Sequence, residues 1–222
     1  MKPRPWSHSA LADFVNCGRQ YHEVRIKKSV PFVETKEITW GNIVHKAFEN
    51  RIAIKAPLAA DLAEHEPYMQ QLEALPGKHF TERKIALNNK MQDCGYFDND
   101  VWFRSVIDFS AVAETEAHIV DYKTGKQKDK FDQLMLNALH LFAQYPSVQT
   151  IHTSFYWVQH YMATSQTFTR DQVPALWNKF LPDLKQYVEA HVTETWQPRQ
   201  SGLCAGWCQI EKCEFWRPRR RR

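Results

Sequence analysis

Apolar residues recur along the chain at two different spacings, and each spacing predicts a different secondary structure. In several segments they return every three to four positions, which is the period of an amphipathic helix. Polar capping residues at the start and Pro or Gly at the end support the limits of some of these segments. The predicted helices are residues 9–28, 39–54, 61–75, 129–144 and 173–192.

Other segments are richer in β-branched and aromatic residues and alternate in part between apolar and polar positions, as strands do. They cover residues 79–87, 101–109, 117–122 and 150–158. The order along the chain is therefore helices, three strands, a helix, a strand and a helix. This order predicts an α/β fold, with a mixed central β-sheet flanked by helices in a single domain over residues 1–222.

Composition agrees with a globular protein, because 43% of the 222 residues are hydrophobic and 13% are aromatic. No stretch of about 20 apolar residues is present, so we expect no membrane partner. The start of the chain does not resemble a signal peptide, and the default location is cytoplasmic. The net charge of +4 is concentrated at the end, where Arg217 and residues 219–222 form an arginine tail. Such a tail can bind phosphates or be merely solvated, and composition favours neither.

Candidate chemistry lies where two predicted strands end. Asp121 and Lys123 stand in the run Ile-Val-Asp-Tyr-Lys-Thr-Gly (119–125), so alternation places both side chains on one face of a strand. Asp108 follows the apolar run 101–107 and is expected to close that strand at the sheet rim. His45, on a predicted helix, adds an imidazole. Carboxylates with an imidazole suit Mg²⁺ or Mn²⁺, and a lysine beside them suits attack on a phosphodiester.

Each of these residues also has a simpler interpretation. A lone histidine on an amphipathic helix is more often a partly buried residue with satisfied hydrogen bonds. Asp108 could cap a turn, and Lys123 could be solvated where its strand runs into a turn. The occurrence of all three features in this order favours a metal-dependent site over three unrelated roles.

With these motifs the chain resembles the RecB-like branch of the PD-(D/E)XK nuclease superfamily, close to CRISPR-associated and phage-encoded RecB-like exonucleases. The resemblance covers nearly the whole chain. Residues 7–11 resemble the family's opening Ser-x-Ser-x-Leu helix, although Cys17-Gly18 stands where Cys-Pro is usual. Gly41 and His45 match the Gly-x-x-x-His motif, and Asp-Tyr-Lys-Thr-Gly (121–125) is the form of (D/E)-x-K that this branch favours. The implied fold is a restriction-endonuclease-like core, with 39–160 as its catalytic part.

The resemblance implies roles for individual residues. His45, Asp108 and Asp121 would bind Mg or Mn together with the backbone carbonyl of Tyr122, and Lys123 would act in catalysis. Gln133 matches the first position of the family's Gln-x-x-x-Tyr motif and would orient Lys123 or the DNA, whereas Asn137 stands where the tyrosine is usual. Glu82, in the strand before Asp108, is expected to support the site rather than to bind metal.

The cysteines suggest a second site. Cys204, Cys208 and Cys213 cluster in the segment 198–222, and Cys17 lies in the N-terminal segment 1–30. Clustered cysteines in an intracellular protein suggest a metal before disulfides. Four thiolates could hold a 4Fe-4S cluster or a structural zinc, and free cysteines in a loop are the simpler interpretation. The resemblance favours iron–sulfur, although Cys208 is shifted by one position from the family's spacing. Cys94 is expected to be unliganded.

The sequence therefore predicts a metal-dependent deoxyribonuclease, and specifically an exonuclease of recombination, repair or phage DNA processing. Its substrate would be single-stranded DNA or DNA with ends. A helicase, recombinase or CRISPR-adaptation protein would be its partner in a bacterial or phage-infected cell. The alternative is a non-catalytic DNA-binding or scaffold protein that keeps the nuclease fold.

Overall fold

The computed structural model describes residues 2–127 and 130–218 and divides into two compact units. The larger unit comprises residues 34–177, and the smaller unit comprises residues 1–33 with 178–222. The arginines of the tail at 219–222 lie outside the described residues, as does Asp129 at the start of one predicted helix. The predicted division into a single domain stays a prediction, and each unit is described by itself.

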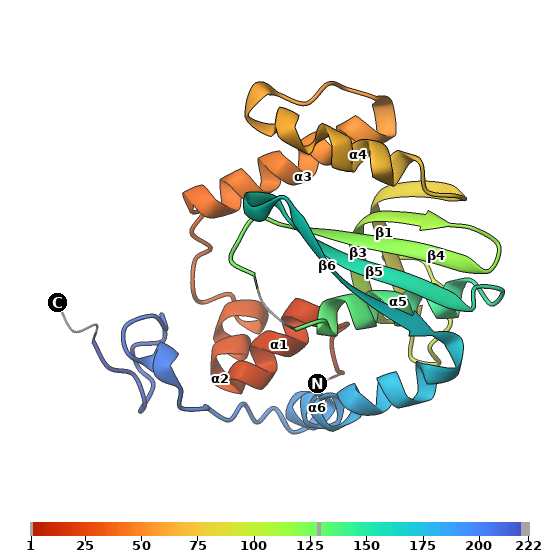
Figure 1. Ribbon diagram of the computed structural model, residues 1–222. Coiled ribbons are helices and arrows are strands. Elements are labelled where there is room, and N and C mark those ends of the chain that lie inside the picture. The colour runs from red at the N-terminus through yellow and green to blue at the C-terminus, as the bar shows by residue number, and fades with distance from the viewer. Residues whose placement is uncertain (1, 128–129, 219–222) are drawn as a thin grey trace. The chain divides into compact units, whose positions relative to one another are not determined.

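A six-stranded mixed sheet forms the centre of the larger unit, in the order β2-β1-β3-β4-β5-β6 (Figure 1). β4 and β5 are parallel, and the other neighbouring pairs are antiparallel. The predicted mixed sheet is thereby confirmed. The strands are β1 (Lys78–Asn88), β2 (Asp93–Cys94), β3 (Val101–Val112), β4 (Glu116–Lys123), β5 (Thr150–Trp157) and β6 (Met162–Thr169).

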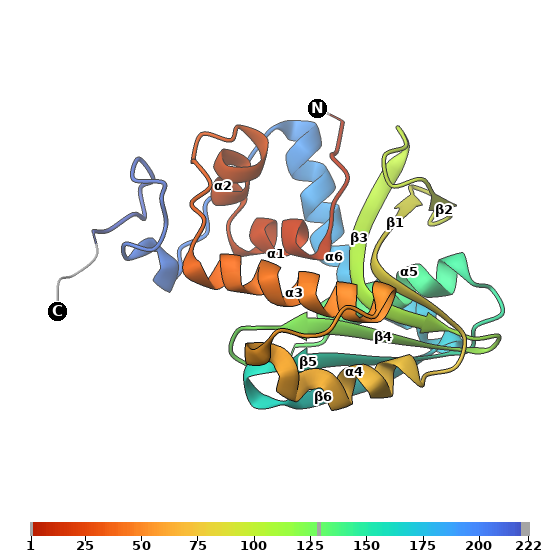
Figure 2. The ribbon, with the colours of Figure 1, turned by 90° about the horizontal axis from the view of Figure 1, so that it is seen from above.

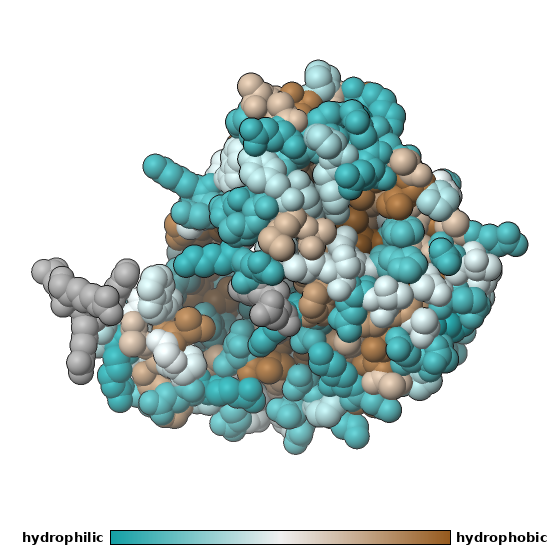
Figure 3. Space-filling model, viewed as in Figure 1, coloured by the Kyte–Doolittle hydropathy of each residue, from teal (hydrophilic) through white to brown (hydrophobic). Residues whose placement is uncertain are grey.

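Two of these strands, β2 and β6, were not predicted. β2 has only two residues, too few to show a pattern. β6 is an edge strand in which Phe168 is the buried position, and the other positions are half-buried or exposed. Its Ser, Thr and Gln side chains leave little of the apolar alternation that identifies a strand, and its surface is largely pale or hydrophilic in Figure 3.

Helices cover both faces of the sheet. α3 (Lys36–Ile54) and α4 (Glu66–Glu73) pack on one face, where Phe48 of α3 meets Tyr122 of β4 edge to face. α5 (Asp132–Gln144) lies on the other face, since Phe131 just before it contacts Phe155 of β5, while the adjacent Tyr156 stacks on Tyr68 of α4. Successive strand residues point to opposite faces, so these contacts place the two helix layers on opposite sides.

The helix limits follow local capping chemistry. α3 begins earlier than predicted, because the Thr35 side chain accepts a hydrogen bond from the backbone N–H of Ile38 and caps the helix. The helix predicted over 61–75 is divided into a 3₁₀ helix (Ala60–His65) and α4, with Pro67 in the first turn of α4, where a missing N–H is tolerated.

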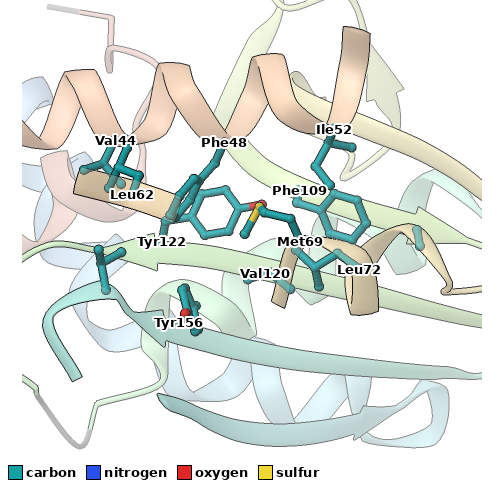
Figure 4. Close-up of a cluster of buried hydrophobic side chains, with 12 residues drawn as sticks. Val44, Phe48, Ile52, Leu62, Met69, Leu72, Phe109, Val120, Tyr122 and Tyr156 are labelled. Atoms are coloured by element: carbon teal, nitrogen blue, oxygen red, sulfur yellow. The ribbon is translucent and has the colours of Figure 1, made fainter. Parts of the chain in front are cut away.

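The core on the α3 face is a cluster of buried side chains from α3, α4 and the strands (Figure 4). Phe48 and Met69 are fully buried there, as are Phe109 and Ala111 of β3. Burying large apolar and aromatic side chains contributes roughly 1.5–3 kcal/mol each. This cluster holds α3 on β3 and β4, and so fixes the helix that carries His45. The labelled residues in Figure 4 are Val44, Phe48, Ile52, Leu62, Met69, Leu72, Phe109, Val120, Tyr122 and Tyr156.

The smaller unit is helical. One continuous helix over 9–28 was predicted, but the structure has α1 (His8–Asn16), α2 (Gly18–Tyr21) and a π-helical turn (His22–Ile26). The break falls at Cys17, whose backbone is extended with φ −166° and ψ 111°. Tyr21 and Tyr187 of α6 (Val173–Thr193) share a 2.7 Å hydrogen bond between their hydroxyls in the core of this unit. No helix among the described residues has the length and apolarity to span a membrane.

Candidate metal and catalytic site

His45 faces two carboxylates in the larger unit. Its Nδ1 lies 3.4 Å from Oδ2 of Asp108 and 3.6 Å from Oε1 of Glu82. Ligand atoms of all three residues lie within 4.8 Å of one another. The core face of α3 aims the imidazole at the sheet, while Glu82 takes a left-handed backbone conformation, φ 45°, in the middle of β1. Sequence reasoning expected Glu82 to be a supporting residue, yet its carboxylate stands in position to be a ligand.

Strands β3 and β4 separate at the two aspartates. Their ladder runs from Val112 opposite Ala117 to Phe109 opposite Val120, and the next residues along are Asp108 and Asp121. Beyond this point β3 pairs with β1 alone and β4 with β5 alone. Where the backbone ladder between β3 and β4 ends, the Asp108 side chain supplies the next hydrogen bond between the strands. Its Oδ2 accepts a 2.7 Å hydrogen bond from the backbone N–H of Tyr122.

Asp108 was expected to close its strand at the sheet rim, and this was wrong. β3 continues to Val112, so Asp108 lies inside the strand and its side chain is buried. Asp108 and Asp121 influence each other electrostatically at the point where the two strands diverge inside the sheet. A run of apolar residues followed by an aspartate does not reveal this divergence. Figure 2 shows β1 and β3 bending away from β4.

Asp121, Lys123 and Gln133 form a closed set of contacts on the α5 face. The Lys123 ammonium pairs with the Asp121 carboxylate and donates a 2.8 Å hydrogen bond to Oε1 of Gln133. The Gln133 amide in turn donates to Asp121 Oδ1. Alternation along β4 puts Asp121 and Lys123 on the same side, and the first turn of α5 brings Gln133 to them.

The backbone of Tyr122 connects these two groups. Its carbonyl accepts a 3.1 Å hydrogen bond from Nε2 of His45, and its N–H is bound by Asp108. The carbonyl oxygen expected to be a metal ligand is thus adjacent to the expected histidine ligand. The structure therefore brings His45 and Asp108 to the backbone of Tyr122, while the adjacent Asp121 contacts Lys123 and Gln133.

The charged groups of the site shift one another's pKa values. Burial opposes a charge on His45, but its hydrogen bonds with Asp108 and Glu82 outweigh burial and raise its pKa to about 10. Burial and the neighbouring Asp108 raise the pKa of Asp121, while Lys123 and His45 oppose that change. Two buried carboxylates that repel each other would be stabilised by a divalent cation. Imidazole, carboxylate and carbonyl ligands fit Mg²⁺ or Mn²⁺.

Asn137 lies one turn beyond Gln133 on α5, where the family motif has tyrosine. It is buried, and its Oδ1 accepts a hydrogen bond from the hydroxyl of Ser105 on β3. Asn137 therefore links α5 to β3, and Gln133 is the residue of this motif that contacts Lys123 and Asp121.

A groove of about 660 Å³ opens beside the cluster, and sequence reasoning missed it. Its walls include His45, Glu82, Asn42 and Thr124. Gly41 forms the closest approach of α3 to the loop after β4, since a Cβ at this position would lie 3.4 Å from the Thr124 hydroxyl oxygen. The Gly-x-x-x-His spacing, which places Gly41 one turn before His45, was the available signal for this wall.

Cys17, Cys204, Cys208 and Cys213 all belong to the smaller unit and are free thiols. Burial raises the pKa of the Cys208 thiol, and the neighbouring Cys17, Cys204 and Cys213 act in the same direction. Cys17 also accepts a hydrogen bond from the backbone N–H of Arg199, with an N to Sγ distance of 3.4 Å. The remaining cysteine, Cys94, belongs to β2 of the larger unit.

Comparisons with known proteins show the family and the fold. Residues 5–217 match the family model of the PD-(D/E)XK nuclease superfamily. A candidate exonuclease from Eubacterium rectale has a similar structure, with a TM-score of 0.54 and 12% sequence identity over 95% of this chain and 86% of that one. The crystal structure of SSO0001 is also similar, with a TM-score of 0.50 and 12% identity over 96% of this chain and 87% of that one. No curated protein matches. The family match covers nearly the whole chain, and the protein belongs to the PD-(D/E)XK nuclease superfamily.

Proposed function

We propose that this protein is a metal-dependent deoxyribonuclease that hydrolyses DNA phosphodiester bonds, acting as an exonuclease. The observation that carries the proposal is the meeting of His45 and Asp108 at the backbone of Tyr122, with the ion pair of Asp121 and Lys123 on the neighbouring positions of β4. A protein that only binds DNA has no evident need for this combination, which argues against the scaffold alternative.

In this proposal His45, Asp108, Asp121 and the Tyr122 carbonyl hold Mg²⁺ or Mn²⁺, and Glu82 is close enough to join them. When bound, such an ion polarises the scissile phosphate and lowers the pKa of a coordinated water. To be a ligand, His45 would have to give up the extra proton that Asp108 and Glu82 favour, so that one ring nitrogen has a free lone pair.

Lys123 is the group that faces the reacting phosphate in this scheme. Its ammonium is aimed by two partners, the Asp121 carboxylate and the Gln133 amide oxygen. From this position it can orient the attacking water or neutralise charge that develops on the phosphate. The groove beside Asn42 and Thr124 offers room for the substrate strand.

A second cofactor is proposed for the smaller unit. Cys17, Cys204, Cys208 and Cys213 would hold a 4Fe-4S cluster, with a structural zinc as the alternative. The proposal is supported by the placement of all four residues in one unit, although they come from opposite ends of the chain. Such a site would tie α1 and α2 to the C-terminal segment, and metal binding would add to the folding free energy of this unit.

The biological setting is proposed from the family. A cytoplasmic enzyme of recombination, repair or phage DNA processing would receive single strands or ends from a helicase, a recombinase or a CRISPR-adaptation protein.

One experiment tests the activity directly. End-labelled single-stranded DNA, linear duplex and a closed circle are incubated with anaerobically purified protein and Mg²⁺, Mn²⁺ or EDTA. We expect metal-dependent loss of the linear substrates while the circle is spared. Cutting of the circle would replace the exonuclease by an endonuclease, and DNA binding without any cleavage would favour the scaffold alternative.

A further inference from the structure

The loop 95–100, between β2 and β3, presents two aromatic side chains. The rings of Tyr96 and Phe97 meet edge to face, with centroids 5.1 Å apart and planes at 78°. Phe97 is 77% exposed, which is unusual for a phenylalanine in a short loop. The loop is held by Asp98, whose Oδ2 accepts a 2.7 Å hydrogen bond from the backbone N–H of Gly95. Phe97 is therefore displayed, with the half-buried Tyr96 beside it, on a turn that Asp98 holds.

Two cationic side chains lie over the same rings. Lys84 Nζ is 5.9 Å from the centroid of Tyr96 and 5.8 Å from that of Phe97. The guanidinium carbon of Arg104 is 5.2 Å and 5.9 Å from the same centroids. Among the described residues, the ion pairs of the structure include neither Lys84 nor Arg104. These cations are therefore held by aromatic faces and remain available to an anion.

This aromatic–basic loop site, formed by Lys84, Tyr96, Phe97 and Arg104, is built on the strands that carry the metal cluster. Lys84 lies two residues beyond Glu82 in β1, and Arg104 lies on β3, the strand of Asp108. Two strand residues span about 7 Å and the four from Asp108 to Arg104 about 13 Å, so an oligonucleotide of a few nucleotides can extend from the metal cluster to these cations. Figure 2 shows β1 and β3 extending away from β4 toward β2.

The charge around the loop limits what the site can bind. The Asp98 carboxylate accepts a hydrogen bond from the backbone N–H of Gly95. The Asp93 carboxylate accepts one from the side-chain amide of Gln144, with an N to O distance of 3.1 Å. Asp100 stays exposed at the end of the loop. A surface with these carboxylates beside two cations does not hold a duplex by charge alone. Stacking on an exposed ring is tolerant of sequence and needs unpaired bases.

We propose that this loop site binds single-stranded DNA, with a base stacked on Phe97 and a phosphate bound by Lys84 or Arg104, and so delivers a single-stranded end to the metal cluster. The proposal rests on the proposed nuclease function and deepens it by assigning a substrate class to named residues. In this proposal base stacking on Phe97 contributes more of the binding free energy than the phosphate contact does.

The test is binding of labelled oligothymidine, measured by fluorescence anisotropy in EDTA so that no cleavage occurs. Phe97→Ala is compared with wild type and with Phe32→Ala, which removes another highly exposed phenylalanine, in the smaller unit. Because one stacked base is worth about 1–3 kcal/mol, Phe97→Ala should weaken binding by about fivefold to a hundredfold. Phe32→Ala should leave the affinity unchanged, and thermal melting checks that both variants fold.

Other outcomes overturn the proposal in distinguishable ways. Equal affinity of wild type and Phe97→Ala removes the loop site, whatever the nuclease assay shows. An equal loss for a blunt duplex of the same length removes the single-strand assignment. If Phe97→Ala lowers oligothymidine binding while wild type cleaves no DNA with Mn²⁺, the loop site stands and the proposed nuclease function fails.

Discussion

Gln133 accepts a 2.8 Å hydrogen bond from the ammonium of Lys123 and donates with its amide nitrogen to Asp121. One side chain thereby sets the position of both the ammonium and the carboxylate. Since Gln133 lies in the first turn of α5, the packing of this helix on the sheet fixes the geometry of residues on β4.

Gln133→Ala should lower kcat by about 10- to 100-fold, the usual effect of losing a partner that orients a reacting group. The expected change in KM is small, because Gln133 has no assigned contact with substrate. Gln133→Asn, which keeps the amide but shortens its reach, should recover little activity. Single-turnover cleavage of labelled DNA measures the effect. A rise in KM at unchanged kcat would instead make Gln133 a substrate contact.

Asp121→Ala and Lys123→Ala should each abolish cleavage and leave the fold intact. Removing one group that stabilises transition-state charge costs about 10²–10³ in kcat, and loss of a metal ligand adds to this. Circular dichroism and melting curves would verify folding of the purified variants. Near wild-type cleavage by either one would remove the site assignment.

The sequence predicted the buried part of the sheet and left out its edges. β3, β4 and β5 have apolar residues that identify them, whereas the exposed positions of β6 are polar and β2 has two residues. The break at Cys17 was also hidden, because an apolar stripe continues across it to Tyr21.

The candidate site could be predicted in its residues but not in its geometry. Alternation correctly put Asp121 and Lys123 on one side of β4. However, the meeting of Asp108 with Asp121 depends on where β3 leaves β4, and a separation of strands has no local sequence signal. The place of Glu82 likewise depends on a left-handed backbone residue inside a strand, which the pattern of β1 does not reveal.

Metal binding should stabilise the larger unit through His45 and Glu82. At a concentration 100 times the Kd, Mn²⁺ should raise the free energy of unfolding by about 2.7 kcal/mol. His45→Ala should remove most of this gain, and Glu82→Gln should reduce it if the carboxylate is a ligand. Thermal melting with and without Mn²⁺ measures the gain, and Glu189→Gln, an exposed carboxylate of α6, is the control. If Mn²⁺ stabilises Glu82→Gln as much as wild type, Glu82 is not a ligand and only supports the site.

The protein should become less stable as the pH decreases, because of His140, a buried residue of α5. Burial lowers its pKa to about 3, against the opposing effect of its hydrogen bond to the Phe103 carbonyl. Between pH 6.5 and 3 the unfolded chain binds a proton that the folded chain does not, so the free energy of unfolding decreases as pH decreases. From pH 7 to pH 5 this group alone should remove about 2 kcal/mol.

His140→Gln should therefore have a smaller decrease in unfolding free energy from pH 7 to pH 5 than wild type, whatever its stability at pH 7. Urea unfolding at the two pH values gives the difference for each protein. His160→Gln, which alters an exposed histidine, should behave as wild type does. An unchanged decrease in His140→Gln would place the acid sensitivity in other buried histidines.

The proposed four-cysteine site makes a prediction that is independent of catalysis. Cys204→Ser should lower the iron or zinc content of anaerobically purified protein and its melting temperature, because metal bound there would contribute to folding of the smaller unit. Cys94→Ser is the matched control, since this thiol lies on β2 of the larger unit and should change neither quantity. Visible absorption distinguishes the two metals, because an iron–sulfur cluster is coloured and zinc is not. Equal metal content and melting temperature in Cys204→Ser and wild type would rule out the four-cysteine site and leave these residues as free thiols.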